Sequence, residues 1–400
     1  MWYIFAMRLL FVADGRSPIT LNWLRHFTES GQQVFLASTF ACTPPPGLSG
    51  FRLIPVAFSG AKKAPAAGAA ARRGIWGAPA LGLRTALRQW LGPLTLPSAA
   101  AALRAYQREI QPDLIHALRI PYEGMLAAQA ADGIPLALSV WGNDFTLHAP
   151  ASPLMGYFTR LALRRADALL ADCARDLRLA RGWGLSAEAP TLTAPGNGGI
   201  RREIFFPAAE TPAAPIVLNP RGFRAYVRND TFFRAIPLVL REMPQTKFRC
   251  VSMADETRAR AWARDLKIED ALELLPALSP AQMAAAFRAA PLMVSPSTHD
   301  GTPNTLLEAM ACGCLPVAGD LESIREWIHP GENGLLVNPA DPQDLAQAIL
   351  RGLRDPALRV RAAAQNAALI TEKGNYEENM RRVETFYRRL LPAPFIKEKK

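Results

Sequence analysis

The sequence lacks most of the features that mark secreted, membrane-spanning or metal-dependent proteins. Its five cysteines form no even disulfide framework, and Cys312-Gly-Cys314 has no second pair at zinc-binding spacing, which predicts buried free thiols in a reducing compartment. No apolar run reaches the roughly 20 residues that a membrane-spanning helix needs. The motif Asp-x-Asp, whose carboxylates could hold a divalent cation, does not occur. We therefore expect a cytoplasmic protein with neither a bound metal nor a cofactor.

The amino terminus also lacks the pattern of a signal peptide. The opening MWYIFAMRLLFVA has no basic segment before its apolar residues and no small-residue cleavage site. We interpret Arg8–Ala13 as a buried first strand, and Met7 is an alternative start of the chain.

Positive charge is unevenly distributed, and most of the net charge of +11 lies in residues 1–200. No basic stripe interleaved with aromatic residues occurs, which argues against a nucleic-acid partner. Residues 59–97 combine six lysines and arginines with apolar residues such as Trp76, Trp90 and Leu91. This composition predicts peripheral contact with an anionic membrane surface on its inner face, or with the acceptor. The alternative is a flexible surface loop followed by a solvated helix.

Apolar strand-like runs alternate with helical patterns in both halves, which predicts two parallel, doubly wound α/β sheets. In the first half the predicted strands are Arg8–Ala13, Gln33–Ser38, Leu114–Ala117, Leu136–Val140, Ala168–Ala171 and Thr191–Ala194. In the second half they are Pro215–Leu218, Lys247–Val251, Leu272–Leu275, Leu292–Val294, Leu315–Ala318 and Gly334–Val337. The Gly- and Pro-rich segment 193–207 lies between the two sets and is interpreted as a linker.

The most informative segment is SPSTHDGTPNTLLEAMACGCLPV, residues 295–317. It places Asp300 and a Gly-Thr-Pro-Asn turn directly before an apolar helix that carries Glu308. Pro303 fits the first turn of that helix, where unpaired N–H groups attract anions. Glu308 lies about one turn inside, within reach of a hydroxyl of the bound molecule. The pattern predicts a nucleotide-sugar site; the alternative is an ordinary strand–loop–helix unit with a polar loop.

This segment resembles the signature of the retaining GT-B glycosyltransferases of family 4, also called group 1 glycosyltransferases. Two acids, Asp300 and Glu308, are separated by seven residues, and LEAMACGCLPV follows the pattern of the family. The first acid is usually Glu in the family, so the reach of Asp300 is one methylene shorter.

The resemblance implies the GT-B fold, in which two Rossmann-like doubly wound α/β domains face a central cleft. The acceptor-binding domain is expected at residues 1–195 and the nucleotide-sugar-binding domain at residues 196–372. Residues 373–400 are expected to form a helix that crosses back to the first domain, followed by a tail. The sequence YEENMRRVETFYRRLL from Tyr376 to Leu391 has the length and periodicity for that helix.

The resemblance also implies a donor site in the second domain, with Arg221 and Arg228 on the diphosphate. Arg221 matches a family arginine by position, whereas Arg228 stands two residues late and replaces a lysine. Glu308 is the expected ribose ligand, and Ser279 ends a loop that lines the base through its backbone. The remaining expected donor-binding residues follow Asp300 and are Gly301, Thr302, Pro303, Asn304 and Thr305.

In the first domain, Gly15 stands at the Gly-rich turn that in the family approaches the donor phosphate and the acceptor. Either Asp14 or Arg16 is expected to contact the acceptor.

Many family members have a histidine after the fourth strand that contacts the transferred sugar, but here Trp141 occupies this position. The contact is therefore expected from Asp144 or Asn143, or from His116 at the end of the preceding strand. Trp141 itself is a further candidate for contact with the sugar or the acceptor.

Together these expectations describe a metal-independent enzyme that moves a sugar from a nucleotide diphosphate sugar to an acceptor hydroxyl with retention of configuration. The acceptor can be a glycan, a lipid-linked glycan or a small molecule, in glycan, polysaccharide or glycolipid synthesis. Asp300, Asp144, Arg221 and Arg228 are the expected catalytic residues, and the leaving phosphate is expected to take the acceptor proton. One alternative is a catalytically weak protein of the same fold that binds a nucleotide sugar. Another is a phosphorylase or a nucleotide-sugar epimerase of that fold.

Overall fold

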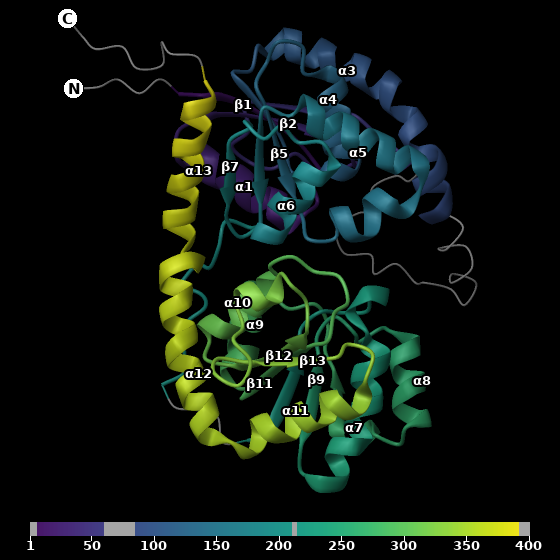
Figure 1. Cartoon of the computed structure of the whole chain (residues 1–400), viewed down its shortest axis with the longest axis vertical. Coiled ribbons are helices and arrows are strands. Elements are labelled where there is room, and N and C mark those ends of the chain that lie inside the picture. Colours follow the sequence, from purple (N-terminus) through teal and green to yellow (C-terminus); the bar gives the residue numbers. More distant parts are fainter. Residues whose placement is uncertain (1–5, 60–84, 210–213, 392–400) are drawn as a thin grey trace, which may run out of the picture. The chain divides into compact units, whose positions relative to one another are not determined.

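The computed structural model describes residues 6–59, 85–209 and 214–391 (Figure 1). The chain divides into unit 1, which comprises Met1–Gly198 and Met380–Lys400, and unit 2, which comprises Gly199–Asn379.

In unit 1 the described strands form one parallel sheet in the order β3-β2-β1-β4-β5-β6-β7. The strands are β1 Arg8–Ala13, β2 Gln33–Ser38, β3 Gly50–Leu53, β4 Leu114–Ala117, β5 Leu136–Val140, β6 Ala168–Ala171 and β7 Thr191–Thr193. The helices are α1 Pro18–Glu29, α3 Leu96–Ile110, α4 Met125–Ala130, α5 Pro153–Arg165 and α6 Ala174–Trp183, with a further helical segment at residues 85–91.

Alternate residues of the unit 1 strands face opposite sides of the sheet, as the pleat requires. Leu10 and Val12 pack into a core with α3, α4 and α5. Phe11 and His116 face the other way, toward aromatic side chains of α1 such as Phe27. The sheet is therefore covered by helices on both faces.

In unit 2 the described strands form a second parallel sheet in the order β10-β9-β8-β11-β12-β13. The strands are β8 Ile216–Asn219, β9 Lys247–Cys250, β10 Leu272–Leu274, β11 Leu292–Ser295, β12 Leu315–Gly319 and β13 Leu335–Val337. The helices are α7 Asn229–Glu242, α8 Thr257–Asp265, α9 Pro280–Arg288, α10 Asn304–Ala311, α11 Pro342–Arg354 and α12 Pro356–Leu369. One core joins the sheet to α7, α8 and α11, and another joins it to α9 and α10.

The closing helix α13, Tyr376–Leu390, begins in unit 2 and continues in unit 1. Its unit 1 part is held by aromatic and polar contacts. The ring of Tyr387 stacks on Phe27 with 5.2 Å between ring centroids. Glu384 Oε1 lies 2.8 Å from His26 Nε2 of α1. The predicted closing helix thus packs on α1 of unit 1 through residues that follow residue 380.

Both predicted doubly wound sheets are confirmed, and each predicted strand ends within one residue of the observed one. The short edge strand β3 was not predicted. Its sequence GFRL has one glycine and one arginine in four residues, and its residues are exposed or half-buried. A strand of this kind carries no apolar run and no clear alternation, so its pairing with β2 decides its conformation.

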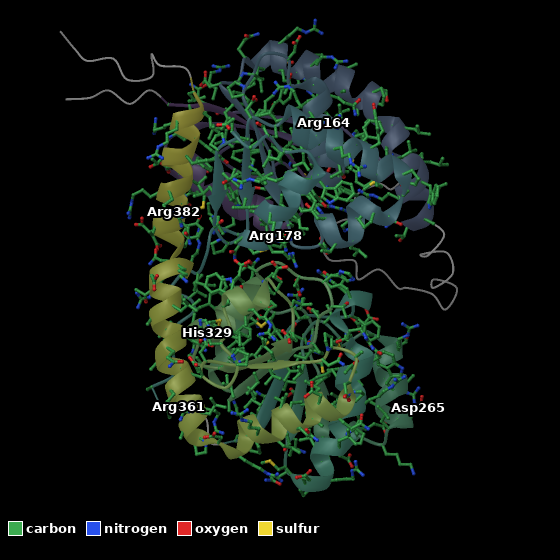
Figure 2. The ribbon with its side chains drawn as sticks, in the orientation of Figure 1. Arg164, Arg178, Asp265, His329, Arg361 and Arg382 are labelled. Atoms are coloured by element: carbon green, nitrogen blue, oxygen red, sulfur yellow. The ribbon has the colours of Figure 1, made fainter. Side chains whose placement is uncertain are left out.

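Charged side chains lie on the outer faces of the helices. Arg164 on α5, Arg178 on α6 and Asp265 at the end of α8 are exposed examples (Figure 2). The five cysteines are unpaired, and four of them are buried. Among the helices of the described ranges, none is both long enough and apolar enough to cross a bilayer.

The strand order of each sheet reverses at one place, which fixes where a ligand can bind. In unit 1 the reversal lies between β1 and β4, and in unit 2 it lies between β8 and β11. In open parallel sheets the crevice beyond the carboxyl ends of such strands is the usual ligand site. The residues that directly follow these strands are therefore the first candidates.

Candidate functional site

The candidate site of unit 2 contains a buried ion pair between the loops that follow β8 and β11. Arg221 Nη2 donates to Asp300 Oδ1 at 3.1 Å, and the two side chains are only 10% and 13% exposed. Burial lowers the pKa of Arg221, but the charge of Asp300 and contacts with Tyr226 more than offset this and raise it. Arg221 is therefore a permanently charged cation at the carboxyl ends of the strands.

Arg221 is held by a tight turn whose polar groups bond to one another. Its N–H donates to Asn219 Oδ1 at 3.1 Å. Asn219 Nδ2 donates to Asn229 Oδ1 at 3.1 Å, and Asn229 Nδ2 donates to the carbonyl of Gly222 at 2.9 Å. Gly222 has φ +65°, a conformation that favours glycine. The start of α7 thus fixes the position of Arg221.

The loop before α10 is anchored from its other side. The hydroxyl of Ser323 donates to the carbonyl of Asp300 at 2.7 Å. Trp327 Nε1 donates to Thr302 Oγ1 at 3.0 Å. Gly301, Thr302 and Pro303 are all buried. The loop is thus packed into unit 2 rather than exposed along its length.

Helix α10 begins at Asn304, so Pro303 occupies the N-cap position and not the first turn as predicted. No side chain caps this helix end. Thr305 Oγ1 is buried and makes no hydrogen bond within the described residues. The N–H of Leu306 already donates to the carbonyl of Pro303 at 3.0 Å. The Thr305 hydroxyl and the N–H groups of Asn304 and Thr305 are therefore the donors at this helix end for an anionic ligand.

Glu308 is half-buried on the same helix and interacts with the charge of Arg221. Burial raises the pKa of Glu308 to about 7, although the positive charge of Arg221 acts in the opposite direction. The structure therefore brings together three predicted residues, Arg221, Asp300 and Glu308. Two acids and one arginine in a buried site can bind hydroxyls and phosphate oxygens at once.

Arg228 and Ser279 have local partners. Arg228 forms two hydrogen bonds to Asp230, each of 2.9 Å, and its backbone has φ +53°. Ser279 caps α9: its hydroxyl accepts from the N–H of Gln282 at 3.4 Å, and Gln282 Oε1 accepts from the N–H of Ser279 at 2.9 Å. The contacts of Arg228 with a diphosphate and of the Ser279 loop with a base stay predictions.

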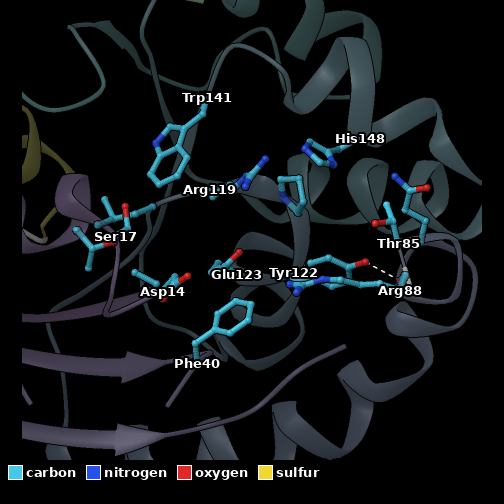
Figure 3. A pocket seen from close by; sticks show the side chains of 15 residues that line it. Asp14, Ser17, Phe40, Thr85, Arg88, Arg119, Tyr122, Glu123, Trp141 and His148 are labelled. Carbon is cyan, nitrogen blue, oxygen red and sulfur yellow. Dashed lines mark hydrogen bonds between the residues drawn. The ribbon is translucent and has the colours of Figure 1, made fainter. Parts of the chain in front are cut away.

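The candidate site of unit 1 is a pocket of about 470 Å³ beyond the carboxyl ends of β1, β4 and β5 (Figure 3). Asp14 follows β1, Arg119 follows β4, and Trp141 follows β5; all three line the pocket. Other lining residues are Ser17, Phe40, Arg88, Tyr122, Glu123 and His148. Of the residues predicted to contact the transferred sugar, Trp141 thus lies in the pocket wall.

Asp144 is not exposed to the pocket, which corrects the prediction that it contacts the sugar. Its side chain has 0% exposure and accepts from Arg119 Nε at 3.0 Å. It also accepts from the N–H groups of Ile120 and Trp141, each at 3.2 Å. Burial raises the pKa of Asp144 above its usual value, although Arg119 and these N–H groups act in the opposite direction. Asp144 is a positioning residue that holds Arg119 and Trp141 in the wall.

Asn143 supports the same arginine, because its Oδ1 accepts from Arg119 Nη2 at 3.2 Å. The pair Asn143 and Asp144 therefore orients the guanidinium from behind.

His116 lies in the core of unit 1, so the prediction that it reaches a bound sugar is wrong. It is 1% exposed, its Nε2 lies 2.8 Å from Ser139 Oγ, and its Nδ1 is hydrogen-bonded to the hydroxyl of Tyr387. Burial lowers the pKa of His116 to about 3, so the ring is neutral. It joins the sheet to α13.

Gly15 is required by close packing. A Cβ at this position would lie 2.5 Å from Cys42 Sγ. The N–H of Gly15 donates to Ser38 Oγ at 3.1 Å, so its predicted approach to a donor phosphate stays untested. The turn places Asp14 in the pocket wall, where it is paired with Arg16 at 2.8 Å. Of the two residues predicted to contact the acceptor, Asp14 lines the pocket.

Sequence reasoning missed Arg119, Glu123 and His148 of this pocket as site residues. Arg119 could have been found, because it comes two residues after β4, at the strand end that faces the site. Glu123 and His148 come from two irregular turns that no motif marks.

Residues 59–97, predicted to contact a membrane or the acceptor, lie largely outside the described residues. Of the part that is described, Arg88 lines the pocket, while Trp90 and Leu91 are 54% and 44% exposed. Membrane contact stays a prediction.

One group of potential metal ligands occurs in the described ranges, formed by Asp172, Cys173 and Asp176. Arg175 already pairs with Asp176 at 2.8 Å, and burial raises the pKa of the Cys173 thiol. A neutral thiol and a neutralised carboxylate are poor metal ligands, so we assign no metal here.

Two family models match this chain. The model described as "Glycosyl transferases group 1" matches residues 218–355, and "Glycosyl transferase 4-like domain" matches residues 15–196. A D-inositol 3-phosphate glycosyltransferase of Acidothermus cellulolyticus is 38% identical over 113 residues, which is 28% of this chain and 25% of that protein. The match thus spans about a quarter of that relative.

Solved structures match over nearly the whole chain. Sucrose-phosphate synthase from Thermosynechococcus elongatus has a TM-score of 0.73 and 20% identity, and the match covers 96% of this chain and 98% of that one. HepE of Anabaena in complex with UDP-glucose has a TM-score of 0.70 and 16% identity, covering 96% and 100%. At these identities the likeness establishes the fold, which is the two-domain Rossmann-like GT-B fold.

Proposed function

Because the chain belongs to the group 1 glycosyltransferases, we propose that it transfers a sugar from a nucleotide diphosphate sugar to an acceptor hydroxyl. The observation that carries this proposal is the largely buried cluster of Arg221, Asp300 and Glu308 at the strand reversal of unit 2. In this proposal unit 2 binds the donor, and the pocket of unit 1 binds the acceptor.

Arg221 is proposed to bind the diphosphate, since its charge is fixed and its guanidinium can contact two phosphate oxygens. The first turn of α10, including Thr305, adds N–H and O–H donors to the same anion. Arg228 is a second candidate for the diphosphate, at the cost of its pairing with Asp230. Glu308 is proposed to accept hydrogen bonds from the ribose hydroxyls.

Transfer is proposed to retain the anomeric configuration. The acceptor oxygen forms a bond to the anomeric carbon on the face from which the diphosphate leaves, and a phosphate oxygen takes the acceptor proton. Arg221 stabilises the charge that develops on the leaving diphosphate. The proposed reaction needs no carboxylate nucleophile, in contrast to that of retaining glycosidases. Since protein cations supply the positive charge, we propose that activity does not require a divalent metal.

The test is release of nucleoside diphosphate from a panel of UDP-, GDP- and ADP-sugars, with simple sugars and polyols as acceptors. UDP-glucose is the first donor to try, because HepE was solved with it. We expect release with one nucleotide series, product of retained configuration by NMR, and equal rates with and without EDTA. Donor binding without any release would favour the alternative of a nucleotide-sugar-binding protein. Absence of binding by every donor would contradict the proposal.

A further inference from the structure

The charged groups of the unit 1 pocket are separated along its length. Figure 3 shows Arg88 and His148 at one side, Asp14 and Ser17 at the other, and Arg119 and Glu123 between them. Two of these charges are already compensated: Asp14 pairs with Arg16, and Arg119 pairs with Asp144. Neither pair includes Arg88, and no carboxylate of the described residues lies within ion-pair distance of it.

Arg88 is held in place by aromatic rings instead of an acid. Its guanidinium carbon lies 4.6 Å from the ring centroid of Tyr122 and 5.0 Å from that of Phe40. The hydroxyl of Tyr122 donates to the carbonyl of Arg88 at 2.6 Å. An aromatic face orients a guanidinium and leaves its N–H groups, which lie in the plane of the guanidinium, able to donate to another acceptor. The side chain is therefore fixed and still able to bind an anion.

The support under Arg88 requires an unfavourable backbone conformation. Tyr122 has φ +69°, in a region that costs a non-glycine residue free energy. Gly92 lies close by: a Cβ there would lie 2.9 Å from Ala57 Cβ and 3.1 Å from both Cε1 and Oη of Tyr122, so a larger residue would displace one of these neighbours. Such conformations occur most often at binding sites, where the surrounding structure enforces them. The position of Tyr122 is thus specifically maintained.

Arg119 and His148 line the same pocket as Arg88. Burial lowers the pKa of His148 to about 3, and the charges of Arg119 and Arg88 act in the same direction. His148 is therefore neutral and can donate one hydrogen bond without adding charge. At the other end, Asp14 and Ser17 offer oxygen acceptors. Glu123, between the two ends, offers another, and its carboxylate already accepts from Thr39 at 2.7 Å. One end thus suits an anion and the other suits hydroxyl groups.

We propose that this pocket binds a hydroxylated acceptor that carries an anionic group, a phosphate or a carboxylate, and that Arg88 binds this group. Arg119 and His148 assist at the anion, and the acidic side chains orient the hydroxyls. The proposal names the acceptor class for the proposed function and rests on it.

The test compares charged and neutral probes of the same size by calorimetry, without any donor. Glucose 6-phosphate and glucuronate are compared with glucose, and glycerol 3-phosphate with glycerol. With the wild-type protein, we expect either the phosphorylated probes or glucuronate to bind at least about tenfold more tightly than the matching neutral probe. This is the effect of a charge-assisted hydrogen bond. Arg88→Gln should remove most of this preference, and Arg88→Lys should restore part of it. Arg108→Gln, an exposed arginine of α3, is the matched control and should leave it unchanged.

The preferred probe identifies the anion: a phosphate preference selects phosphorylated acceptors, and a glucuronate preference selects acidic sugars. A wild type that binds no charged probe more tightly than its neutral partner overturns the proposal, and so does full selectivity in Arg88→Gln. Donor binding is measured separately on wild type and Glu308→Gln. Normal donor binding with no anion preference overturns this inference alone, whereas an anion preference without donor binding overturns the proposed function.

Discussion

The candidate sites of units 1 and 2 occupy the same place in two sheets of similar topology, but different stretches of chain supply them. In unit 2, Asp300 and Glu308 lie on one loop and helix, and Arg221 joins them from the neighbouring strand end. In unit 1 the pocket draws on residues after four strands, β1, β2, β4 and β5, and on the helical segment 85–91. Two sheets of similar topology can therefore receive their functional side chains from different segments of the chain.

The two sites also differ in how their charges are balanced. In unit 2 the arginine and the acid pair directly with each other inside the site. In unit 1 the acid that balances Arg119 is Asp144, which lies behind the wall with 0% exposure. Unit 2 thus places both partners of the pair at the strand ends, whereas unit 1 places the cation in the pocket wall and its partner behind it. Mutations should accordingly affect chemistry most in unit 2 and stability most in unit 1.

The largest expected effect is on turnover, from Arg221→Ala in unit 2. Loss of the group that stabilises the leaving diphosphate should lower kcat by roughly 10²–10³-fold, as for other preorganised electrostatic groups. Steady-state release of nucleoside diphosphate measures this, with circular dichroism to confirm folding. Arg241→Ala, an exposed arginine of α7, is the control and should keep the wild-type rate. Equal rates in both variants would remove Arg221 from the site.

In unit 1 the largest expected effect is on stability, from Asp144→Ala. Arg119 loses its buried partner, and two backbone N–H groups lose an acceptor. We expect a loss of about 3 kcal/mol in the free energy of unfolding. Urea denaturation measures it against Asp132→Ala, an exposed acid in the same unit. A fully stable variant with abolished turnover would contradict the positioning role and restore a direct catalytic one.

The pH dependence of stability should report the raised pKa of Glu308, and the matched variant Glu308→Gln isolates it from other buried acids. Its pKa is raised from 4.5 to about 7, so the folded protein holds this proton more tightly than the unfolded chain. Its contribution to stability is full below pH 4.5 and is lost as the pH rises through 7.

We therefore expect the unfolding free energy of wild type to fall relative to Glu308→Gln over this range, by on the order of 1–3 kcal/mol. Urea denaturation of both proteins at several pH values gives the difference. Parallel profiles would show that Glu308 has an ordinary pKa.

The smallest expected effect concerns the contact between α13 and the unit 1 sheet. Tyr387→Phe removes the hydroxyl bonded to His116 Nδ1 but keeps the ring that stacks on Phe27. A loss of about 1 kcal/mol in unfolding free energy is expected, the usual value of one buried hydrogen bond. Tyr157→Phe, at an exposed tyrosine of α5, serves as the control. No difference between the two variants would mean that the bond to His116 contributes nothing to stability.

The sequence was sufficient for the sheets because buried parallel strands are continuous apolar runs, as in Leu136–Val140. It was sufficient for the unit 2 cluster because Asp300 and Glu308 lie within one contiguous motif. It was insufficient for His116 and Asp144. Both follow or end a strand near the site, and only the direction of the side chain, set by the pleat and by packing, separates core from pocket. Arg88 on the helical segment 85–91 contacts Tyr122, which is distant in the sequence, only through tertiary packing. No local sequence pattern predicts such a contact.

The most direct test of the account is calorimetric titration of UDP, GDP and ADP into wild type and Glu308→Gln. We predict that one nucleoside diphosphate binds wild type and that its affinity falls at least about tenfold in the variant, the effect of losing a charge-assisted hydrogen bond. Equal binding by both proteins, or no binding of any nucleoside diphosphate, would contradict the assignment of the donor site to Arg221, Asp300 and Glu308.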